Sequence, residues 1–348
     1  MSSHVPNPPR WRIEFGVIPG LEAVLCAELS RSLGPENLIV DRIPGRILVR
    51  TNRPLRDFLQ LRTAIAAYLA IPFDVPRPRA LLGQAYRSRL EQGFEALQSI
   101  DGNSFESFRI SASGSDSRIF QRLSDLVQEI TGLPHDPYGG ELLIRVRPGR
   151  PTGGWDVLMR LTPRPLSARA WRVRDFPGAI NSTIAAAMVD LTAPQRSDRF
   201  LNPMSGSATL LIERAAAGPL AYSIGCEISS STAALGRENV RAAGFEDDTH
   251  LVVADTASLP FEDESFDKLC ADLPWGARIG SHEENKSLYP AFLSEAMRVS
   301  GGGARLAVLT HDFRLFESAL KGTRWEIDLS IRLRLKGAHP RLYVLSCT

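Results

Sequence analysis

The sequence has few cysteines and no long apolar run. Its four cysteines lie far apart without a CxxC pair, and His135, His282 and His311 have no acid or cysteine at ligand spacing, so neither a zinc site nor a disulfide framework is predicted. No stretch approaches the roughly 18 consecutive apolar residues of a membrane span. The first 25 residues also lack the charged head and apolar run of a secretory signal. We therefore expect a cytoplasmic protein with reduced cysteines, no metal and no membrane partner.

Lysine is also scarce, and the charge is unevenly distributed. Only four of the 41 basic residues are lysines. Residues 1–175 carry 24 basic and 18 acidic side chains, whereas residues 176–348 carry 17 and 21. The positive N-terminal half favours a polyanionic partner such as RNA, because arginine binds phosphates through a bidentate fork and releases their counterions. A GC-rich coding sequence would give the same arginine excess, so both explanations stay open.

Length and composition favour two or three domains. The chain has 348 residues, of which 43% are hydrophobic and 23% charged, values that are typical of a soluble globular protein. A first unit ends at a proline-rich stretch near residue 75. Within it we predict strands at 11–15 and 43–49 and helices at 21–34 and 55–69.

A second unit follows and ends near residue 166. Its patterns predict helices at 82–97 and 117–131 and strands at 107–112, 141–147 and 155–161. Arginines crowd its last two strands and the segment after them. Their density favours a surface that contacts phosphates, although a solvated strand face would also carry some arginines.

Strands and helices alternate from about residue 178 onward, which predicts a doubly wound, mostly parallel sheet. The predicted strands are 200–201, 221–228, 250–254, 266–272 and 304–309, and the predicted helices are 180–191, 209–217, 230–243 and 288–299. The last two strand-like runs, 325–335 and 341–346, are joined by only five residues. Because a crossover needs a longer connection, we expect this pair to form an antiparallel hairpin.

Polar or small residues follow four of these strands, where ligands of such sheets bind. The segment Asn202–Ala208 follows the first strand, and its small residues let backbone N–H groups approach a ligand. Glu227 ends the second strand, where an acid can accept both hydroxyls of a ribose. Asp255 follows the third strand and the segment 272–276 the fourth. Together these positions predict a nucleoside pocket.

Two phosphate-binding glycine motifs are absent. Neither GxGxxG nor GxxxxGKS/T occurs in the sequence, which argues against NAD and ATP. A loop with one glycine and no lysine suits a nucleoside ligand without phosphates. S-adenosylmethionine is such a ligand.

Two segments carry a resemblance to a known family. Asn202-Pro-Met-Ser-Gly-Ser-Ala-Thr-Leu-Leu-Ile-Glu-Arg-Ala215 resembles the DPxxGSGTxxIEAA cofactor motif of RNA guanine-N2 methyltransferases with a THUMP domain. Asp272-Leu-Pro-Trp-Gly276 resembles their catalytic motif, in which Asp or Asn and then Leu or Pro precede Pro, an aromatic residue and Gly. Val17-Ile-Pro-Gly-Leu-Glu22 is similar to the opening of the family's N-terminal domain, and residues 109–174 resemble THUMP and its exit.

The resemblance is strongest to the TrmN branch of the family and implies both fold and function. It implies an α/β and α+β multidomain chain with an N-terminal ferredoxin-like domain (1–75), a THUMP RNA-binding domain (76–166), a linker (167–178) and a Rossmann-fold class I methyltransferase domain (179–348). The implied activity is S-adenosylmethionine-dependent methylation of the exocyclic N2 of a guanosine, at position six of the tRNA acceptor stem. We expect the enzyme to act as a monomer.

The same resemblance implies site residues by their positions in the motifs. The implied cofactor contacts are Asn202, Met204, Ser205, Gly206, Ser207, Ala208, Glu227, Ile228, Asp255, Thr256 and Asp272. The implied catalytic residues are Asp272, Leu273, Pro274 and Trp275. The candidate RNA contacts are Arg145, Arg147, Arg160, Arg169, Arg172, Arg174 and Arg278.

In the implied reaction, Asp272 accepts a hydrogen bond from the guanine amine, helped by the backbone carbonyl of Leu273 or Pro274. Trp275 stacks on the base. The amine is a poor nucleophile because its lone pair is delocalised into the ring, so orientation and a fixed negative charge are the means of catalysis. A base in a paired stem must also be flipped out, and an aromatic platform compensates part of the unstacking energy.

Two departures from the family pattern concern the cofactor loop. Asn202 stands where the motif has Asp and lacks its charge, and Ala208 stands where the motif has its second Gly, which matters if that position needs a positive φ. A non-catalytic RNA-binding protein with a degenerate methyltransferase domain is therefore an alternative hypothesis. A second alternative is the same chemistry on another tRNA or ribosomal RNA guanosine.

Overall fold

The computed structural model describes residues 11–34, 38–100, 104–149, 153–275 and 281–347. The chain divides into two compact units. The first contains residues 1–17 and 26–166, and the second contains residues 18–25 and 167–348.

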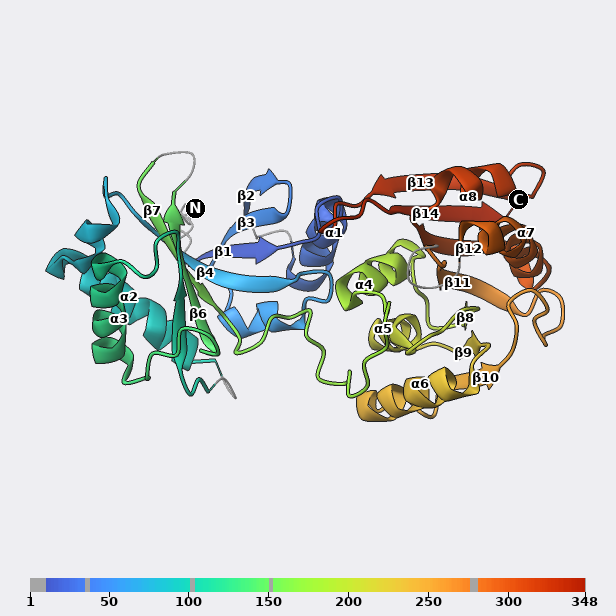
Figure 1. Ribbon diagram of the computed structural model, residues 1–348, viewed down its shortest axis with the longest axis horizontal. Helices are drawn as coiled ribbons and strands as arrows, with labels where there is room; N and C mark the ends of the chain where they lie inside the picture. The colour runs from blue at the N-terminus through green and yellow to red at the C-terminus, as the bar shows by residue number, and fades with distance from the viewer. Residues whose placement is uncertain (1–10, 35–37, 101–103, 150–152, 276–280, 348) are drawn as a thin grey trace, which may run out of the picture. The chain divides into compact units, whose positions relative to one another are not determined.

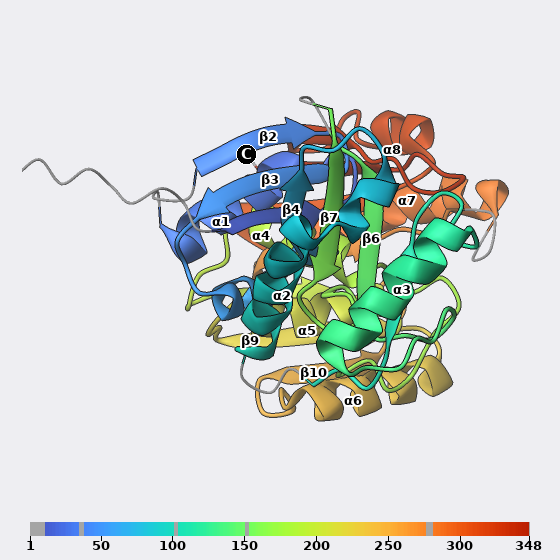
Figure 2. The ribbon, with the colours of Figure 1, turned by 90° about the vertical axis from the view of Figure 1, so that its left-hand side faces the viewer.

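The first unit contains one seven-stranded sheet with the strand order β2-β3-β1-β4-β7-β6-β5. Its strands are β1 Trp11–Gly16, β2 Leu38–Ile43, β3 Arg46–Thr51, β4 Ala66–Phe73, β5 Phe108–Ser111, β6 Leu142–Pro148 and β7 Trp155–Arg160. Its α-helices are α1 Glu22–Leu33, α2 Gln84–Gln98 and α3 Arg118–Thr131, and its 3-10 helices are η1 Leu55–Gln60 and η2 Pro78–Leu82. The first turn of α1 belongs to the second unit. Figure 2 shows α2 and α3 lying across one face of this sheet.

β4 joins the two predicted N-terminal units into this single sheet. It pairs antiparallel with β1 on one side and with β7 on the other. The predicted boundary near residue 75 therefore follows β4 without interrupting the sheet.

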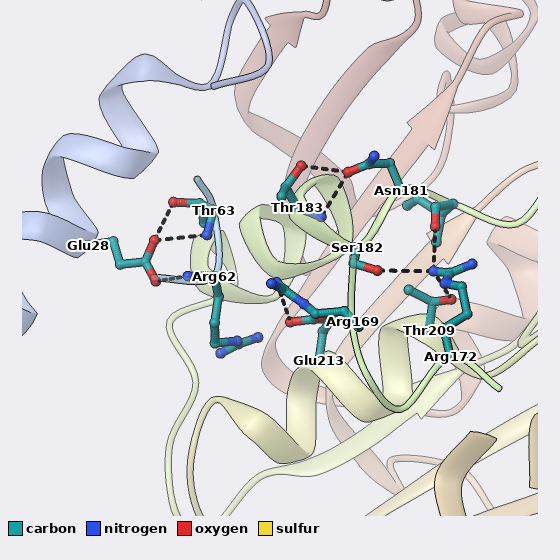
Figure 3. Close-up of polar contacts among 11 residues, drawn as sticks. Glu28, Arg62, Thr63, Arg169, Arg172, Asn181, Ser182, Thr183, Thr209 and Glu213 are labelled. Atoms are coloured by element: carbon teal, nitrogen blue, oxygen red, sulfur yellow. Dashed lines mark hydrogen bonds and ion pairs between the residues drawn. The ribbon is translucent and has the colours of Figure 1, made fainter. Parts of the chain in front are cut away.

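The predicted helix at 55–69 is wrong. The chain forms only the short helix η1 there and then enters β4, a continuous apolar run that is buried almost throughout. A run buried on both faces has no alternation of polar and apolar residues, so periodicity cannot distinguish it from a buried helix. Between the two elements, Glu28 of α1 accepts the backbone N–H groups of Arg62 and Thr63 at 2.6 and 2.9 Å, which holds the chain in a turn (Figure 3).

The predicted strand at 43–49 is a smaller error. The chain turns at Pro44 and Gly45, so that this range joins the end of β2 to most of β3. Gly45 has a φ of +83°, which suits the tight hairpin between the two strands.

The second unit has the predicted doubly wound sheet, with the strand order β10-β9-β8-β11-β12-β14-β13. Its strands are β8 Arg199–Asn202, β9 Tyr222–Glu227, β10 Thr249–Val253, β11 Phe266–Asp272, β12 Ser300–Thr310, β13 Trp325–Arg332 and β14 Arg341–Cys347. Its helices are α4 Ser182–Leu191, α5 Thr209–Ala216, α6 Ser230–Ala243, α7 His282–Arg298 and α8 Phe313–Ala319. Figure 1 shows α4, α5 and α6 on one side of the sheet and α7 on the other.

The predicted parallel order and the predicted final hairpin are both confirmed. The strands from β10 to β12 run parallel, whereas β14 is antiparallel to both β12 and β13. The carboxyl ends of β8, β9, β10 and β11 therefore lie along one edge of the sheet, as a nucleoside site requires.

Two helices of this unit differ from their predictions. α7 begins six residues before the predicted start, because Ser281 caps it by accepting the backbone N–H of Glu284 at 3.2 Å. Pro290 lies inside α7, although a proline favours a helix start. α8 was not predicted, since seven residues are too few to show a helical period. No helix in the described ranges is long and apolar enough to cross a membrane.

Candidate active site

A cavity of about 750 Å³ opens at the carboxyl ends of β8 to β11. It is lined by the loop after β8, by the residues that follow β9 and β10, and by Asp272 to Trp275 after β11. Of the residues predicted to contact the cofactor or the target base, only Ala208 does not line it. The rule that ligands bind beyond the carboxyl ends of parallel strands therefore predicted this cavity from the sequence.

The loop after β8 is held against β9 by backbone hydrogen bonds. The N–H of Gly206 donates to one carboxylate oxygen of Glu227 at 3.0 Å, and the N–H of Ser229 donates to the other at 3.0 Å. The N–H of Ser205 donates to the carbonyl of Cys226 at 2.7 Å. Gly225 allows this close approach, because a Cβ there would lie 2.8 Å from the Cβ of Ser205. The loop is therefore preorganised by contacts that this chain supplies itself.

Ala208 occupies the left-handed region at the start of α5. Its φ is 67°, and its side chain is fully buried. The position thus needs the positive φ at which the family motif has glycine, and a non-glycine residue costs about 1–2 kcal/mol there. Its methyl group fits because α6 has Gly236 opposite, where even an added Cβ would be 3.4 Å away from that of Ala208.

We expect Ala208→Gly to leave the cofactor affinity unchanged or to increase it. The glycine removes the backbone strain of about 1–2 kcal/mol, while the lost burial of a methyl group, about 0.8 kcal/mol, offsets part of the gain in stability. Calorimetric titration with S-adenosylhomocysteine measures the affinity, and thermal unfolding measures the stability. A clear weakening of binding in a protein of unchanged stability would contradict this account of the loop.

Asn202 suits its position because its side chain is uncharged and can donate hydrogen bonds. The side chain is buried, and with its amide turned so that the NH₂ group faces them it donates to the carbonyl oxygens of Cys270 at 3.0 Å and Met204 at 3.2 Å. An aspartate would place a carboxylate against two carbonyl oxygens. Asn202 therefore joins β8 to β11 at the floor of the cavity, and its departure from the family motif does not disrupt the loop.

Asp272 stands at the end of β11 beside Trp275. The indole N–H of Trp275 donates to one oxygen of the carboxylate at 3.2 Å, and the ring stacks on His311 with a centroid distance of 5.9 Å. Burial raises the pKa of Asp272 to about 7, and the hydrogen bond from Trp275 offsets part of that rise. His311, for which the sequence predicted no ligand role, thus covers one face of the tryptophan.

The carbonyl of Pro274 is occupied by two buried donors of α7. Tyr289 donates its hydroxyl at 2.8 Å, and Asn285 donates its side-chain NH₂ at 2.9 Å. The hydroxyl of Tyr289 also pairs with that of Thr310 at the end of β12, at 2.9 Å. Both lone pairs of Pro274 are therefore in use, which leaves the carbonyl of Leu273 as the backbone acceptor near Asp272.

The lining fits S-adenosylmethionine. Within the described ranges, the buried hydroxyls of Ser205 and Thr256 have no hydrogen-bond partner, as expected for groups that await a polar ligand. Ile228 follows Glu227 and is 70% exposed at the cavity, where its apolar surface suits a purine ring. The acids Glu227 and Asp255 at the same strand ends suit ribose hydroxyls and amines.

Two segments that line the cavity were not predicted, besides single residues such as Leu288 of α7. Phe176 and the segment 178–180 precede α4, and the segment 335–338 forms the turn between β13 and β14. A signal for the turn was present, because a hairpin whose first strand runs parallel to β12 must turn at the same edge of the sheet.

Three of the predicted RNA contacts instead hold the segment after residue 166 against helices of the second unit, and Figure 3 shows two of them, Arg169 and Arg172. Arg169 pairs with the buried Glu213 of α5 at 2.8 Å. Arg172 donates to the carbonyl of Ile180 and to the hydroxyls of Ser182 and Thr209, at 3.1, 3.1 and 3.0 Å, and burial lowers its pKa. Arg174 pairs with Glu238 of α6 at 2.6 Å. Much of the predicted linker is thus bound to α4, α5 and α6.

The other candidate arginines have different environments. Arg160 is 5% exposed, and it donates to the backbone carbonyls of Thr162, Glu141 and Pro163, so its predicted phosphate contact is wrong. Arg147 pairs with Glu14, whereas Arg145 is exposed and lies over the ring of Tyr68 at 4.7 Å. Arg278 lies outside the described residues. Sequence density did not reveal these roles, because the partners are distant in the chain.

Comparison with known proteins matches most of the second unit to a family model and almost the whole chain to a relative. Residues 169–341 match the family model described as RMKL-like, methyltransferase domain. A tRNA (guanine(6)-N2)-methyltransferase of Thermus thermophilus is 28% identical over 343 residues, which are 96% of this chain and 98% of that protein. A bovine tRNA (guanine(6)-N(2))-methyltransferase THUMP3 is 34% identical over 188 residues, 49% of this chain but only 37% of that protein.

A solved structure extends the likeness to the fold. TrmN from Thermus thermophilus superposes with a TM-score of 0.79 at 25% identity, covering 97% of this chain and 100% of that one. The resemblance predicted from the two motifs is confirmed, and residues 169–341 of the chain form an RMKL-like methyltransferase domain.

Proposed function

We propose that this protein transfers the methyl group of S-adenosylmethionine to the exocyclic N2 of a guanosine in tRNA, at position six of the acceptor stem. The observation that carries the proposal is the pair of acceptors at the end of β11, where the carboxylate of Asp272 and the carbonyl of Leu273 adjoin a nucleoside cavity. The relative that aligns over almost its whole length carries the same activity in its name. The proposed place of action is the cytoplasm, and the proposed state is a monomer.

The cofactor residues have distinct parts in this proposal. Glu227 and Asp255 accept hydrogen bonds from hydroxyls and amines of the cofactor, and Ile228 packs on its adenine. Ser205 and Thr256 supply the hydroxyls that have no protein partner. When bound, the cofactor supplies an electrophilic methyl group on a positively charged sulfur.

The target amine is held by the segment after β11. One N–H donates to Asp272 and the other to the carbonyl of Leu273, which directs the nitrogen lone pair toward the methyl group and favours a pyramidal nitrogen. The fixed carboxylate stabilises the positive charge that develops on the nitrogen. Trp275 stacks on the base with the face that His311 leaves open. The ammonium product is acidic and loses its proton without a strongly tuned base.

Residues 1–75 and 76–166 would place the RNA as ferredoxin-like and THUMP domains, mainly through the shape of its backbone. Their shared sheet supports joint action of the two segments. The degenerate scaffold is the weaker alternative, because Asn202 and Ala208 are both accommodated by their surroundings.

The pH dependence of methylation follows from Asp272. Its pKa of about 7 means that the carboxyl is protonated at lower pH, where it loses negative charge and an acceptor site. We therefore expect kcat/KM to rise tenfold per pH unit below about pH 7 and to level off above it. Trp275→Phe removes the N–H that favours the carboxylate, so the midpoint should move to higher pH.

Profiles between pH 5.5 and 8.5 for both proteins check this expectation. His311→Gln is the control, since it removes the histidine that stacks on Trp275 and should leave the midpoint unchanged. A midpoint that disappears with His311 would assign the titration to the imidazole, and a flat wild-type profile would contradict the role of Asp272.

The target is tested with tRNA transcripts and radiolabelled cofactor. A transcript with guanosine at position six should accept one methyl group, recovered as N2-methylguanosine, and a transcript with adenosine there should accept none. Equal incorporation into both would overturn the position and favour the alternative of another guanosine. U6 snRNA is a useful third substrate, because a bovine relative named for it is 31% identical over 148 residues.

A further inference from the structure

The turn between β13 and β14 is rigid and projects to the cavity. Beyond the two strands, the N–H of Leu333 donates to the carbonyl of Pro340 at 2.9 Å, and Leu335 and Ala338 exchange two hydrogen bonds of 2.9 and 3.2 Å. Lys336 and Gly337 therefore form a two-residue turn, for which the φ of +78° at Gly337 is suited. The hairpin is an ordered arm with a lysine at its tip.

Side chains alternate along this arm. Leu333 is buried and Leu335 lines the cavity, whereas Arg332, Arg334 and Lys336 are exposed. No acidic residue occurs between Asp328 and the end of the hairpin turn, and within the described ranges none of the three cations has an ion pair. Arg332, Arg334 and Lys336 thus form an exposed row of uncompensated charge, which we call the basic hairpin face.

One end of the basic hairpin face, Lys336, lies at the cavity. Lys336 lines the same cavity as Asp272 and Trp275. The base of the arm is fixed in the second unit, because the N–H of Arg334 donates to the carbonyl of Pro19 at 3.0 Å. Gly20 packs so closely that a Cβ there would lie 2.6 Å from the carbonyl oxygen of Arg332. The charges therefore have a defined position relative to the base that would enter the cavity.

A guanosine that enters the cavity brings its own phosphates with it. Alternate residues of a strand are about 6.6 Å apart, a spacing similar to that of successive phosphates along an extended RNA strand. We propose that Arg332, Arg334 and Lys336 bind the phosphates that flank the flipped nucleotide, with Lys336 nearest to the target. This proposal rests on the proposed function and supplies an RNA contact that the predicted arginines Arg160, Arg169 and Arg172 do not.

The test compares single and triple variants with a matched control. Lys336→Ala and the triple variant R332A/R334A/K336A remove one and three charges from the arm. Lys321→Ala is the control, because Lys321 is also an exposed lysine but lies before β13, at the other end of that strand. Dissociation constants for tRNA are measured at several salt concentrations, together with the tRNA KM, kcat, calorimetric binding of S-adenosylhomocysteine and thermal unfolding.

We expect Lys336→Ala to weaken tRNA binding about eightfold at 0.1 M salt and to lower the salt slope by about 0.9, the value for one phosphate contact in a duplex. The triple variant should lower the salt slope by about two to three times the value for one phosphate contact. The tRNA KM should rise accordingly, while the unfolding temperature remains near that of the wild type. Lys336→Arg should restore binding, and Lys321→Ala should change nothing.

Two outcomes separate the failure of this proposal from failure of the proposed function. A triple variant that is folded, binds cofactor and keeps the wild-type affinity and salt slope overturns the basic hairpin face. A wild-type protein that binds tRNA but methylates none overturns the activity, while the binding measurements still decide the role of the hairpin. A wild-type protein that binds no RNA overturns both.

Discussion

Asp272→Ala is expected to reduce methyl transfer by at least about a hundredfold, the effect of removing one preorganised electrostatic partner of a transition state. RNA affinity should remain nearly unchanged. The carboxylate orients the guanine amine and stabilises the charge on it, and neither interaction contributes much to the binding of the RNA as a whole. Single-turnover transfer from radiolabelled cofactor measures the chemical step, and binding is measured separately.

Asp272→Asn is the matched variant, because it keeps the volume and one oxygen acceptor but loses the charge. We expect it to be more active than Asp272→Ala and to lose the rise in activity with pH. A large loss of RNA binding in either variant would show that Asp272 is structural, and transfer at the wild-type rate would remove it from the mechanism.

Arg214→Ala is expected to lower the free energy of unfolding by about 3–5 kcal/mol, as for the loss of one partner of a buried ion pair. Arg214 stands in α5 and is fully buried. Its guanidinium donates to the carboxylate of Asp198 at 2.9 Å and to the carbonyls of Gln195 and Gly218 at 2.6 and 3.1 Å. The substitution leaves a buried carboxylate and two carbonyls without their donor. Urea unfolding, analysed with a common slope, measures the change.

Arg241→Ala serves as the control on the neighbouring helix α6. Its side chain is 70% exposed and lies 3.4 Å from Glu246, so its loss should change the stability by less than about 1 kcal/mol. The double variant Asp198→Asn with Arg214→Met should recover part of the loss, because it removes the unpaired charge. A change of less than about 1 kcal/mol for Arg214→Ala would contradict the structural role of the pair.

The fold of the second unit could be predicted where signals were local. The strand predicted at 266–272 coincides with β11, and the helix predicted at 230–243 coincides with α6, which Gly244 ends with a positive φ of 73°. Polar and turn residues between the elements mark their ends there. The predicted helix at 55–69 was wrong for the opposite reason. β4 is central in its sheet, and a strand with two buried faces gives no pattern that a sequence can reveal.

The candidate site was predictable to a similar degree. The cavity residues follow from one rule about strand ends, together with two motifs. The roles of the arginines could not be predicted in that way, because each guanidinium binds the acceptors that the fold places beside it. Arg169 meets Glu213 across 44 positions of sequence, and Arg174 meets Glu238 across 64. The same residue type at similar density forms structural ion pairs in one segment and an exposed charged row in the hairpin.

The order of the last strands has a consequence for synthesis of the chain. β13 precedes β14 in the sequence, yet β14 lies between β13 and β12 in the sheet. On the ribosome, β13 therefore has no partner until β14 has emerged and inserted beside β12. Until then both backbone edges of β13, which carries the exposed Ile327 and Leu329, are unpaired and open to association with other chains, whereas the finished sheet leaves only one edge unpaired. A nascent chain stalled at the hairpin turn would lack both β14 and the lysine at the mouth of the cavity, so completion of this sheet waits on β14.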